Sequence, residues 1–309
     1  MLPRILIPLV VATLPLHAVI VAQGDGTQNT TAPVDDFGFA NVGVIFDPAD
    51  GIFVGGVYLG GGWVLSAYHG VRDASQTGFQ FGDAYFGGQL CTVDASSATR
   101  LHTPGFASAD LALFHLTSEP ALPSVTIASV APTDNLSLVM MGAGPSREAT
   151  ETHWIVNTAV NPYTWTETPL AGNFQGYKWN GSPMLRWGTN NITAFSGGDT
   201  TANADDGFGV TNLFKTNFTN TAGEGQAGSG DSGGGVFWKV GGQWQLGGIL
   251  LATGSYSGQP AGTAVFGDET YAANLSAYRT EITSIVPEPS SAALLLGGAT
   301  FALRRRRRA

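Results

Sequence analysis

The sequence predicts an all-β fold, and three observations lead to it. The chain of 309 residues holds 43 glycines, without the period of three found in collagen, and this content suits a protein with many turns. Short runs rich in β-branched and aromatic residues recur between Gly and Asp turns. Only residues 270–285 show convincing helical periodicity, with Leu275, Tyr278, Ile282 and Ile285 on one face.

Composition excludes several classes of protein. Apolar residues make up 43% of the chain and charged residues 12%, so most of it can fold around a sizeable core. Arg4 and Arg304 to Arg308 account for six of the 14 basic residues, which leaves eight against 23 acidic residues. This acidic body argues against binding to nucleic acid. Cys91 is the only cysteine, so an intramolecular disulfide is excluded, and we expect it to be a small buried side chain.

The first 22 residues predict a secretory signal peptide. Arg4 precedes a long apolar run, and Ile20-Val21-Ala22 offers a cleavage site of the expected kind. A transmembrane anchor is the weaker alternative, because the run is short and is interrupted by Pro8 and Pro15.

A flexible segment, residues 23–40, and then a folded domain, residues 41–285, are expected to follow. Strands are predicted at residues 42–46, 52–59, 63–66, 236–240, 244–252 and 261–266. Residues 145–226 are read as a second all-β half with long loops. Within it, Asp199, Asp205 and Asp206 could hold a hard cation such as Ca²⁺, but their spacing matches no known loop and a solvated loop is favoured.

A glycine-rich stretch, residues 228–235, draws attention to Ser232. Glycine permits positive φ angles and a close approach of a substrate to the main chain. A tight turn of this kind can present the Ser232 hydroxyl and aim backbone N–H groups at one point, where they stabilise an oxyanion. The alternative is an ordinary Gly/Ser surface turn.

A histidine and an aspartate elsewhere supply the partners that such a serine needs. His69 follows a strand end, and Asp110 leads into an alternating strand. Each alone is an unremarkable polar residue, but an imidazole can take the proton of a hydroxyl while a carboxylate orients the ring. His115 shares a strand face with Leu111 and Leu113, so packing is its expected role.

The local sequences resemble the trypsin/chymotrypsin-like serine peptidases. Residues 63–69 (WVLSAYH) are similar to the strand before that family's catalytic histidine, residues 110–113 (DLAL) look like its aspartate motif, and residues 230–234 (GDSGG) match its nucleophile motif throughout. The resemblance covers roughly residues 41–285. It implies two packed six-stranded β-barrels with a catalytic triad in the cleft between them.

The resemblance also implies roles for single residues. Ser232 would be the nucleophile, His69 the general base and then acid, and Asp110 its orienter. The backbone N–H groups of Gly230 and Ser232 would form the oxyanion hole. Gln226, six residues before the serine, would lie at the base of the substrate pocket and argues against a strict preference for Arg or Lys. No cofactor and no metal are implied.

The chain departs from the family at several positions. Gly70 stands where the family has a disulfide cysteine, and no basic residue lies between Arg4 and Arg72 to permit trypsin-type zymogen cleavage. The family's equivalent of Asp231 pairs with a newly freed N-terminus. Here its partner is left open between an N-terminus made another way and a local polar group.

The C-terminal segment, residues 286–309, forms a separate part of the chain. Pro287-Glu288-Pro289 precedes a short apolar run and the arginine cluster of residues 304–308. This order is similar to the PEP-CTERM sorting signal of Gram-negative bacteria. It implies an apolar anchor helix, temporary membrane retention, cleavage by an exosortase and a final place at the cell surface or in the matrix. A polyarginine arm for nucleic acid is the alternative.

The sequence therefore predicts an exported, monomeric serine endopeptidase that acts on protein or peptide substrates. Two alternatives remain open: a catalytically silent surface or matrix binding module with the same fold, and an esterase that uses the same triad.

Overall fold

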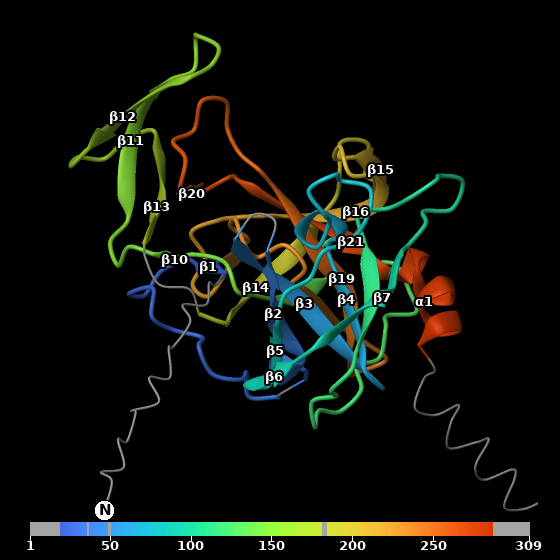
Figure 1. Cartoon of the computed structure of the whole chain (residues 1–309). Coiled ribbons are helices and arrows are strands. Elements are labelled where there is room, and N and C mark those ends of the chain that lie inside the picture. The colour runs from blue at the N-terminus through green and yellow to red at the C-terminus, as the bar shows by residue number, and fades with distance from the viewer. Residues whose placement is uncertain (1–18, 36, 49–50, 181–183, 287–309) are drawn as a thin grey trace, which may run out of the picture.

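The first half of the chain forms a curled antiparallel sheet (Figure 1). The computed structural model describes residues 19–286 except 36, 49–50 and 181–183. The sheet has the strand order β6-β5-β2-β3-β4-β8-β7. Its strands are β2 (Val42–Asp47), β3 (Ile52–Gly60), β4 (Trp63–Ser66), β5 (Ala84–Phe86), β6 (Gln89–Cys91), β7 (Val93–Arg100) and β8 (Ala112–Leu116).

The second half forms a closed six-stranded barrel. Its strand order is β14-β9-β18-β19-β21-β16, and pairing of β14 with β16 closes it, while β15 adds to the outer edge of β16. These strands are β9 (Ser137–Gly142), β14 (Arg186–Thr193), β15 (Ala202–Asp205), β16 (Val210–Asn217), β18 (Gly235–Val240), β19 (Gln243–Gly254) and β21 (Glu269–Asn274).

A smaller sheet projects from the barrel (Figure 1). It contains β10 (Ser146–Arg147), β11 (Thr152–Asn157), β12 (Thr164–Thr168), β13 (Phe174–Asn180) and β20 (Thr263–Val265). Trp154 and Val156 of β11 and Val265 of β20 form a separate apolar cluster of this sheet. This sheet accounts for much of the region in which the sequence predicted long loops.

One apolar core joins the two halves. It includes Val57 and Leu113 of the curled sheet together with Met141, Phe237 and Ile249 of the barrel, and each of these side chains is fully buried. Because the two sheets share this core, the residues at their junction are held in a fixed arrangement.

The fold corrects the prediction of two six-stranded barrels. The barrel of the second half is closed, but the sheet of the first half ends at β6 and β7, whose outer edges pair with no other described strand. The edge strand β6 and its neighbour β5 have only three residues each, and neither pairs with β7 to complete a cylinder.

The predicted C-terminal helix is also shorter than expected. Residues 269–274 form β21, which pairs with β19 and β16 on its two sides. The 3₁₀-helix η3 (Leu275–Ala277) and the helix α1 (Arg279–Ile285) follow. The hydrogen bonds that β21 makes to β19 and β16 therefore outweigh the helical pattern of this alanine-containing segment.

The first described residues, 19–22, are part of the folded body. β1 (Ile20–Val21) pairs with β17 (Gly225–Gln226), and Val19 to Ala22 are each only 1% exposed. A cleavage after Ala22 would remove these buried residues. Farther on, the Gln23 backbone N–H donates to the Tyr177 hydroxyl, and Asn29 donates to the carbonyl of Trp187.

In the described residues, no helix is long and apolar enough to cross a membrane. The sorting motif Pro287-Glu288-Pro289 and the expected anchor helix after it lie outside the described residues.

Candidate active site

Two neighbouring strands bring His69 and Asp110 together. β4 leads into the 3₁₀-helix η2 (Tyr68–Gly70), and Asp110 lies two residues before β8, which pairs with β4 through Ser66 and Ala112. The Asp110 Oδ2 lies 2.6 Å from His69 Nδ1, and its Oδ1 accepts the backbone N–H of His69 at 2.8 Å.

The carboxylate of Asp110 is fully buried, whereas the His69 side chain keeps 20% of its surface exposed. The backbone N–H of Asp110 donates to the Thr211 hydroxyl at 2.8 Å, which ties the aspartate to β16 of the barrel. The pair is thus held from both halves of the fold, and part of the His69 side chain stays exposed.

A loop that the sequence did not connect with the site lies beside this pair. The Phe208 ring is 5.3 Å from the imidazole, centroid to centroid, and the Arg72 guanidinium lies over Phe208. Asp206 is exposed, yet partial burial and then the charge of Asp110 raise its pKa to about 6. Burial disfavours the imidazolium of His69, but Asp110 and Asp206 outweigh this effect and raise the His69 pKa.

The serine loop is attached to strand β3. The backbone N–H of Gly55 donates to the Ser232 carbonyl at 2.6 Å. Gly233, with φ +85°, lies so close that a Cβ there would be 2.0 Å from the Gly55 carbonyl oxygen. Only glycine fits this conformation and this approach.

The same loop holds backbone N–H groups that have no partner. Those of Asp231, Gly233 and Gly234 donate to carbonyl oxygens, whereas those of Gly230 and Ser232 donate to no acceptor in the described part of the chain. These two N–H groups beside a half-buried hydroxyl are available to stabilise an oxyanion.

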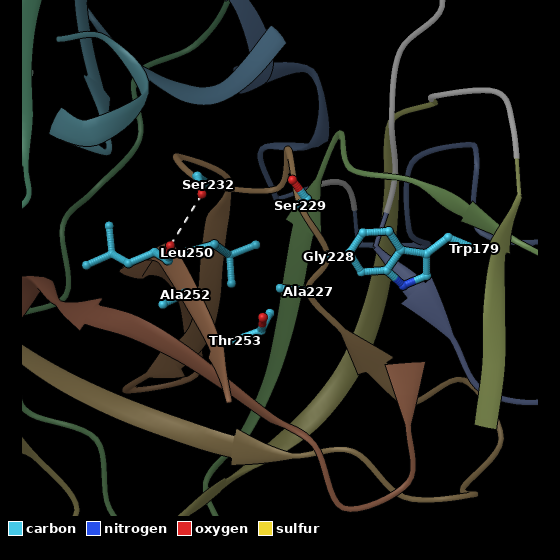
Figure 2. A pocket seen from close by; sticks show the side chains of 9 residues that line it. Trp179, Ala227, Gly228, Ser229, Ser232, Leu250, Ala252 and Thr253 are labelled. Atoms are coloured by element: carbon cyan, nitrogen blue, oxygen red, sulfur yellow. Dashed lines mark hydrogen bonds between the residues drawn. The ribbon is translucent and has the colours of Figure 1, made fainter. Parts of the chain in front are cut away.

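Strand β3 also brings the serine and histidine to one place. Gly70, next to His69, packs against Val54, while Ser232 and Gly233 contact Gly55. The Ser232 hydroxyl donates to the Leu251 carbonyl at 3.3 Å (Figure 2). No hydrogen bond among the described residues joins His69 to Ser232.

A cavity of about 230 Å³ opens beside Ser232. Figure 2 shows Trp179 on the side opposite Ser232, with Ala227 and Thr253 between them. Gln226, predicted at the pocket base, lines an adjoining cavity of about 140 Å³. Its side-chain oxygen accepts from the Thr270 hydroxyl at 3.0 Å, and its amide donates to the Glu269 carbonyl.

Asp231 lies buried behind the serine. It accepts backbone N–H groups of Gly228 and Gly144, and these are the only hydrogen bonds that its carboxylate makes to the described residues. Burial raises its pKa to about 7. Asp199 and Asp205 are exposed, and the described residues include no cluster of three metal-binding side chains.

Comparison with known proteins adds little to this site. No model of a known protein family matches the chain, and no curated protein matches its sequence. Solved structures do match. One is a serine-to-alanine mutant of Rv3671c from M. tuberculosis in an inactive form, with a TM-score of 0.47 and 15% sequence identity. That match covers 88% of this chain and 98% of the other. A likeness at this level says nothing about activity.

Proposed function

We propose that the protein is a serine endopeptidase. The observation that carries the proposal is the bonded pair of His69 and Asp110 next to a serine loop with two free N–H groups. A pocket beside Ser232 provides room for a substrate side chain. In this proposal the Ser232 hydroxyl turns from the Leu251 carbonyl towards His69 when a substrate binds.

Each residue then has a defined chemical task. Ser232 Oγ attacks the peptide carbonyl and forms a C–O bond, while His69 Nε2 takes the hydroxyl proton. The C–N bond breaks, the proton passes to the departing amine, and an acyl ester remains on Ser232. A water molecule, deprotonated by His69, hydrolyses this ester. Asp110 keeps Nδ1 protonated and stabilises the imidazolium.

Labelling of the purified full chain with a fluorophosphonate probe tests the proposal. We expect labelling that Ser232→Ala and His69→Ala abolish. His115→Ala is the control, because His115 packs on Trp63 outside the site; it should label normally. Absence of labelling in a well-folded wild type would favour a silent binding module instead.

A second measurement separates the peptidase from an esterase. Both would be labelled, but only a peptidase cleaves an internal bond in an unstructured protein such as casein, in addition to simple esters. Hydrolysis of esters alone would favour the esterase.

We also propose that the protein is exported and sorted through its C-terminal segment. This proposal rests on the sequence order of Pro287-Glu288-Pro289, an apolar run and an arginine cluster. An exosortase-type enzyme would process the tail and release the protein to the surface or matrix. Replacement of the three motif residues by alanine should leave the protein in the membrane fraction with its tail intact; release of the variant at the normal rate would exclude this role.

A further inference from the structure

The loop of residues 206–209, which joins β15 to β16, is anchored next to the His–Asp pair. The Val210 carbonyl accepts the Thr103 hydroxyl at 2.6 Å. Gly209 has φ +127°, and a Cβ there would lie 2.6 Å from the Ser108 carbonyl oxygen. Only glycine combines this conformation with this approach. The loop therefore lies directly on the chain segment that leads to the aspartate of the pair.

Phe208, in this loop, packs against His69. Its backbone N–H donates to Asp206 Oδ1 at 2.9 Å, which shapes the turn. The centres of the Phe208 ring and the imidazole are 5.3 Å apart, and their planes are inclined by 33°, which lies within the range of aromatic contacts. Phe208 also packs against the apolar cluster of the curled sheet, which includes Tyr68 and Phe114. A side chain from the second half of the chain thus contacts both the imidazole and the core of the first half.

Arg72 links Phe208 to the main chain of the histidine. Its Nη1 donates to the His69 carbonyl oxygen, and its guanidinium carbon lies 5.0 Å from the centre of the Phe208 ring. A guanidinium over an aromatic ring is attracted by the negative face of that ring. One side chain therefore contacts both His69 and the ring that packs against it, and the three residues form one contiguous cluster.

Three charged residues act on the imidazole from the elements packed around it: Asp110 before β8, Asp206 in the loop and Arg72 after η2. Burial lowers the pKa of His69, whereas the hydrogen bond and charge of Asp110 and then the charge of Asp206 raise it. The charge of Arg72 lowers it, and the net result is a raised pKa. Arg72 thus opposes the two carboxylates by charge, in addition to its contact with Phe208.

Resting on the proposed peptidase function, we propose that Phe208 and Arg72 are positioning residues for His69. The Ser232 hydroxyl donates to a main-chain carbonyl, so other contacts must orient the imidazole until the serine turns towards it. Asp110 holds the ring at Nδ1, and Phe208 restrains it from the second half of the fold. Arg72 keeps Phe208 and the histidine main chain together. A general base needs its nitrogen within hydrogen-bond reach of the hydroxyl, and a small displacement lowers the rate strongly.

Turnover of a peptide substrate by the full-length protein tests the role of Phe208. Phe208→Ala should lower kcat about 10- to 100-fold and change KM less than about threefold, because the ring positions the base and does not bind the substrate. Phe208→Tyr keeps the ring and should restore kcat to within about threefold of wild type. Phe106→Ala removes an exposed phenylalanine and is the matched control, with wild-type turnover. An unchanged kcat in Phe208→Ala, or a rise in KM alone, would overturn the proposal.

The pH dependence of kcat/KM tests Arg72. Loss of its positive charge favours the imidazolium of His69, so Arg72→Gln should move the acidic limb of the profile to higher pH by about half a pH unit. This direction is opposite to that expected for loss of the Asp206 carboxylate. Arg72→Lys keeps the charge and should leave the limb in place. A limb that stays in place in Arg72→Gln, or moves to lower pH, would contradict the proposal.

Nuclear magnetic resonance of the imidazole tests the same contacts without turnover. Full-length Ser232→Ala protein with isotope-labelled histidine should give a His69 signal, which is identified by its loss when His69→Ala is added. Addition of Phe208→Ala should change the chemical shift of this signal, because the ring current of the phenylalanine is lost. Addition of Arg72→Gln should instead raise the pKa at which the signal titrates.

The signal of His115 is the internal control for folding. His115 packs on Trp63 outside the site, so its signal should be the same in every variant. The expected changes at His69 in a chain that a fluorophosphonate fails to label would support the positioning contacts and reject the peptidase. A His69 signal that neither Phe208→Ala nor Arg72→Gln alters would overturn the proposal, whatever the labelling shows.

Discussion

Asp110 holds His69 by two hydrogen bonds, one at the imidazole Nδ1 and one at the backbone N–H of the same residue. The two bonds use different oxygens of one fully buried carboxylate. They fix both the position of the main chain at His69 and the orientation of its ring. With Nδ1 bonded to Asp110, the other ring nitrogen is the one available to a substrate or to Ser232.

Asp110→Asn should therefore leave the fold intact but remove most of the activity. The side-chain amide can still accept from the His69 backbone N–H, but its NH₂ group then faces Nδ1 and favours the wrong tautomer. We expect kcat/KM to fall about 10³- to 10⁴-fold, measured on a peptide substrate. Circular dichroism should show an unchanged fold, and activity within tenfold of wild type would exclude the proposed role of Asp110.

Asp206→Asn should move the acidic limb of the pH–rate profile to lower pH. His69 must be neutral to act as a base, so kcat/KM falls as pH decreases through its pKa. The negative charge of Asp206 contributes to the raised pKa of His69, and its removal lowers that pKa. The difference should be clearest above about pH 6, where Asp206 itself is ionised.

Asp205→Asn is the matched control for this experiment. Asp205 is the exposed neighbour of Asp206 and accepts the backbone N–H of Gly207, while it does not contribute to the pKa of His69. Its profile should follow that of wild type. A limb that stays in place in Asp206→Asn, or moves to higher pH, would show that Asp206 does not act on His69.

The sequence was sufficient for the strands next to the site. The predicted run 63–66 is β4, and runs 42–46 and 52–59 lie within β2 and β3. These segments combine β-branched residues with glycine or aspartate turns, so local pattern and tertiary packing agree. His69 and Asp110 follow from their positions at strand ends, which pairing of β4 with β8 then brings together.

Other features depend on contacts that no local pattern reveals. Asp206 lies 96 positions after Asp110 in a loop without a motif, and only the path of β15 and β16 brings it near the imidazole. The helical pattern after Thr270 failed because pairing partners on both sides of β21 decide its structure. The burial of Val19 to Ala22 and the pairing of β1 with β17 also do not follow from the sequence, because an apolar run and a buried strand look alike in it.

Gly233→Ala should disrupt the serine loop. The new Cβ would lie 2.0 Å from the Gly55 carbonyl oxygen and 2.5 Å from Ser66 Oγ, so the loop must separate from β3. We expect loss of fluorophosphonate labelling and a lower free energy of unfolding. Gly241→Ala separates the clash from backbone strain, because Gly241 also has positive φ but no atom within 4 Å. If both variants label equally well, contact of the loop with β3 does not position Ser232.

A chain that begins at Gln23 should be much less stable than one that begins at Val19. The shorter chain lacks four fully buried residues, three of them large and apolar, and it lacks the pairing of β1 with β17. Burial of each large apolar side chain stabilises the fold by about 2 kcal/mol, so the loss should be on the order of 5 kcal/mol. This is a substantial part of the stability of a typical domain.

Urea unfolding of the two chains measures the difference in their free energies of unfolding. Equal stability would show that residues 19–22 do not contribute to the folded body. N-terminal sequencing of the exported protein provides an independent check, since a start at or before Val19 is expected if these residues are required.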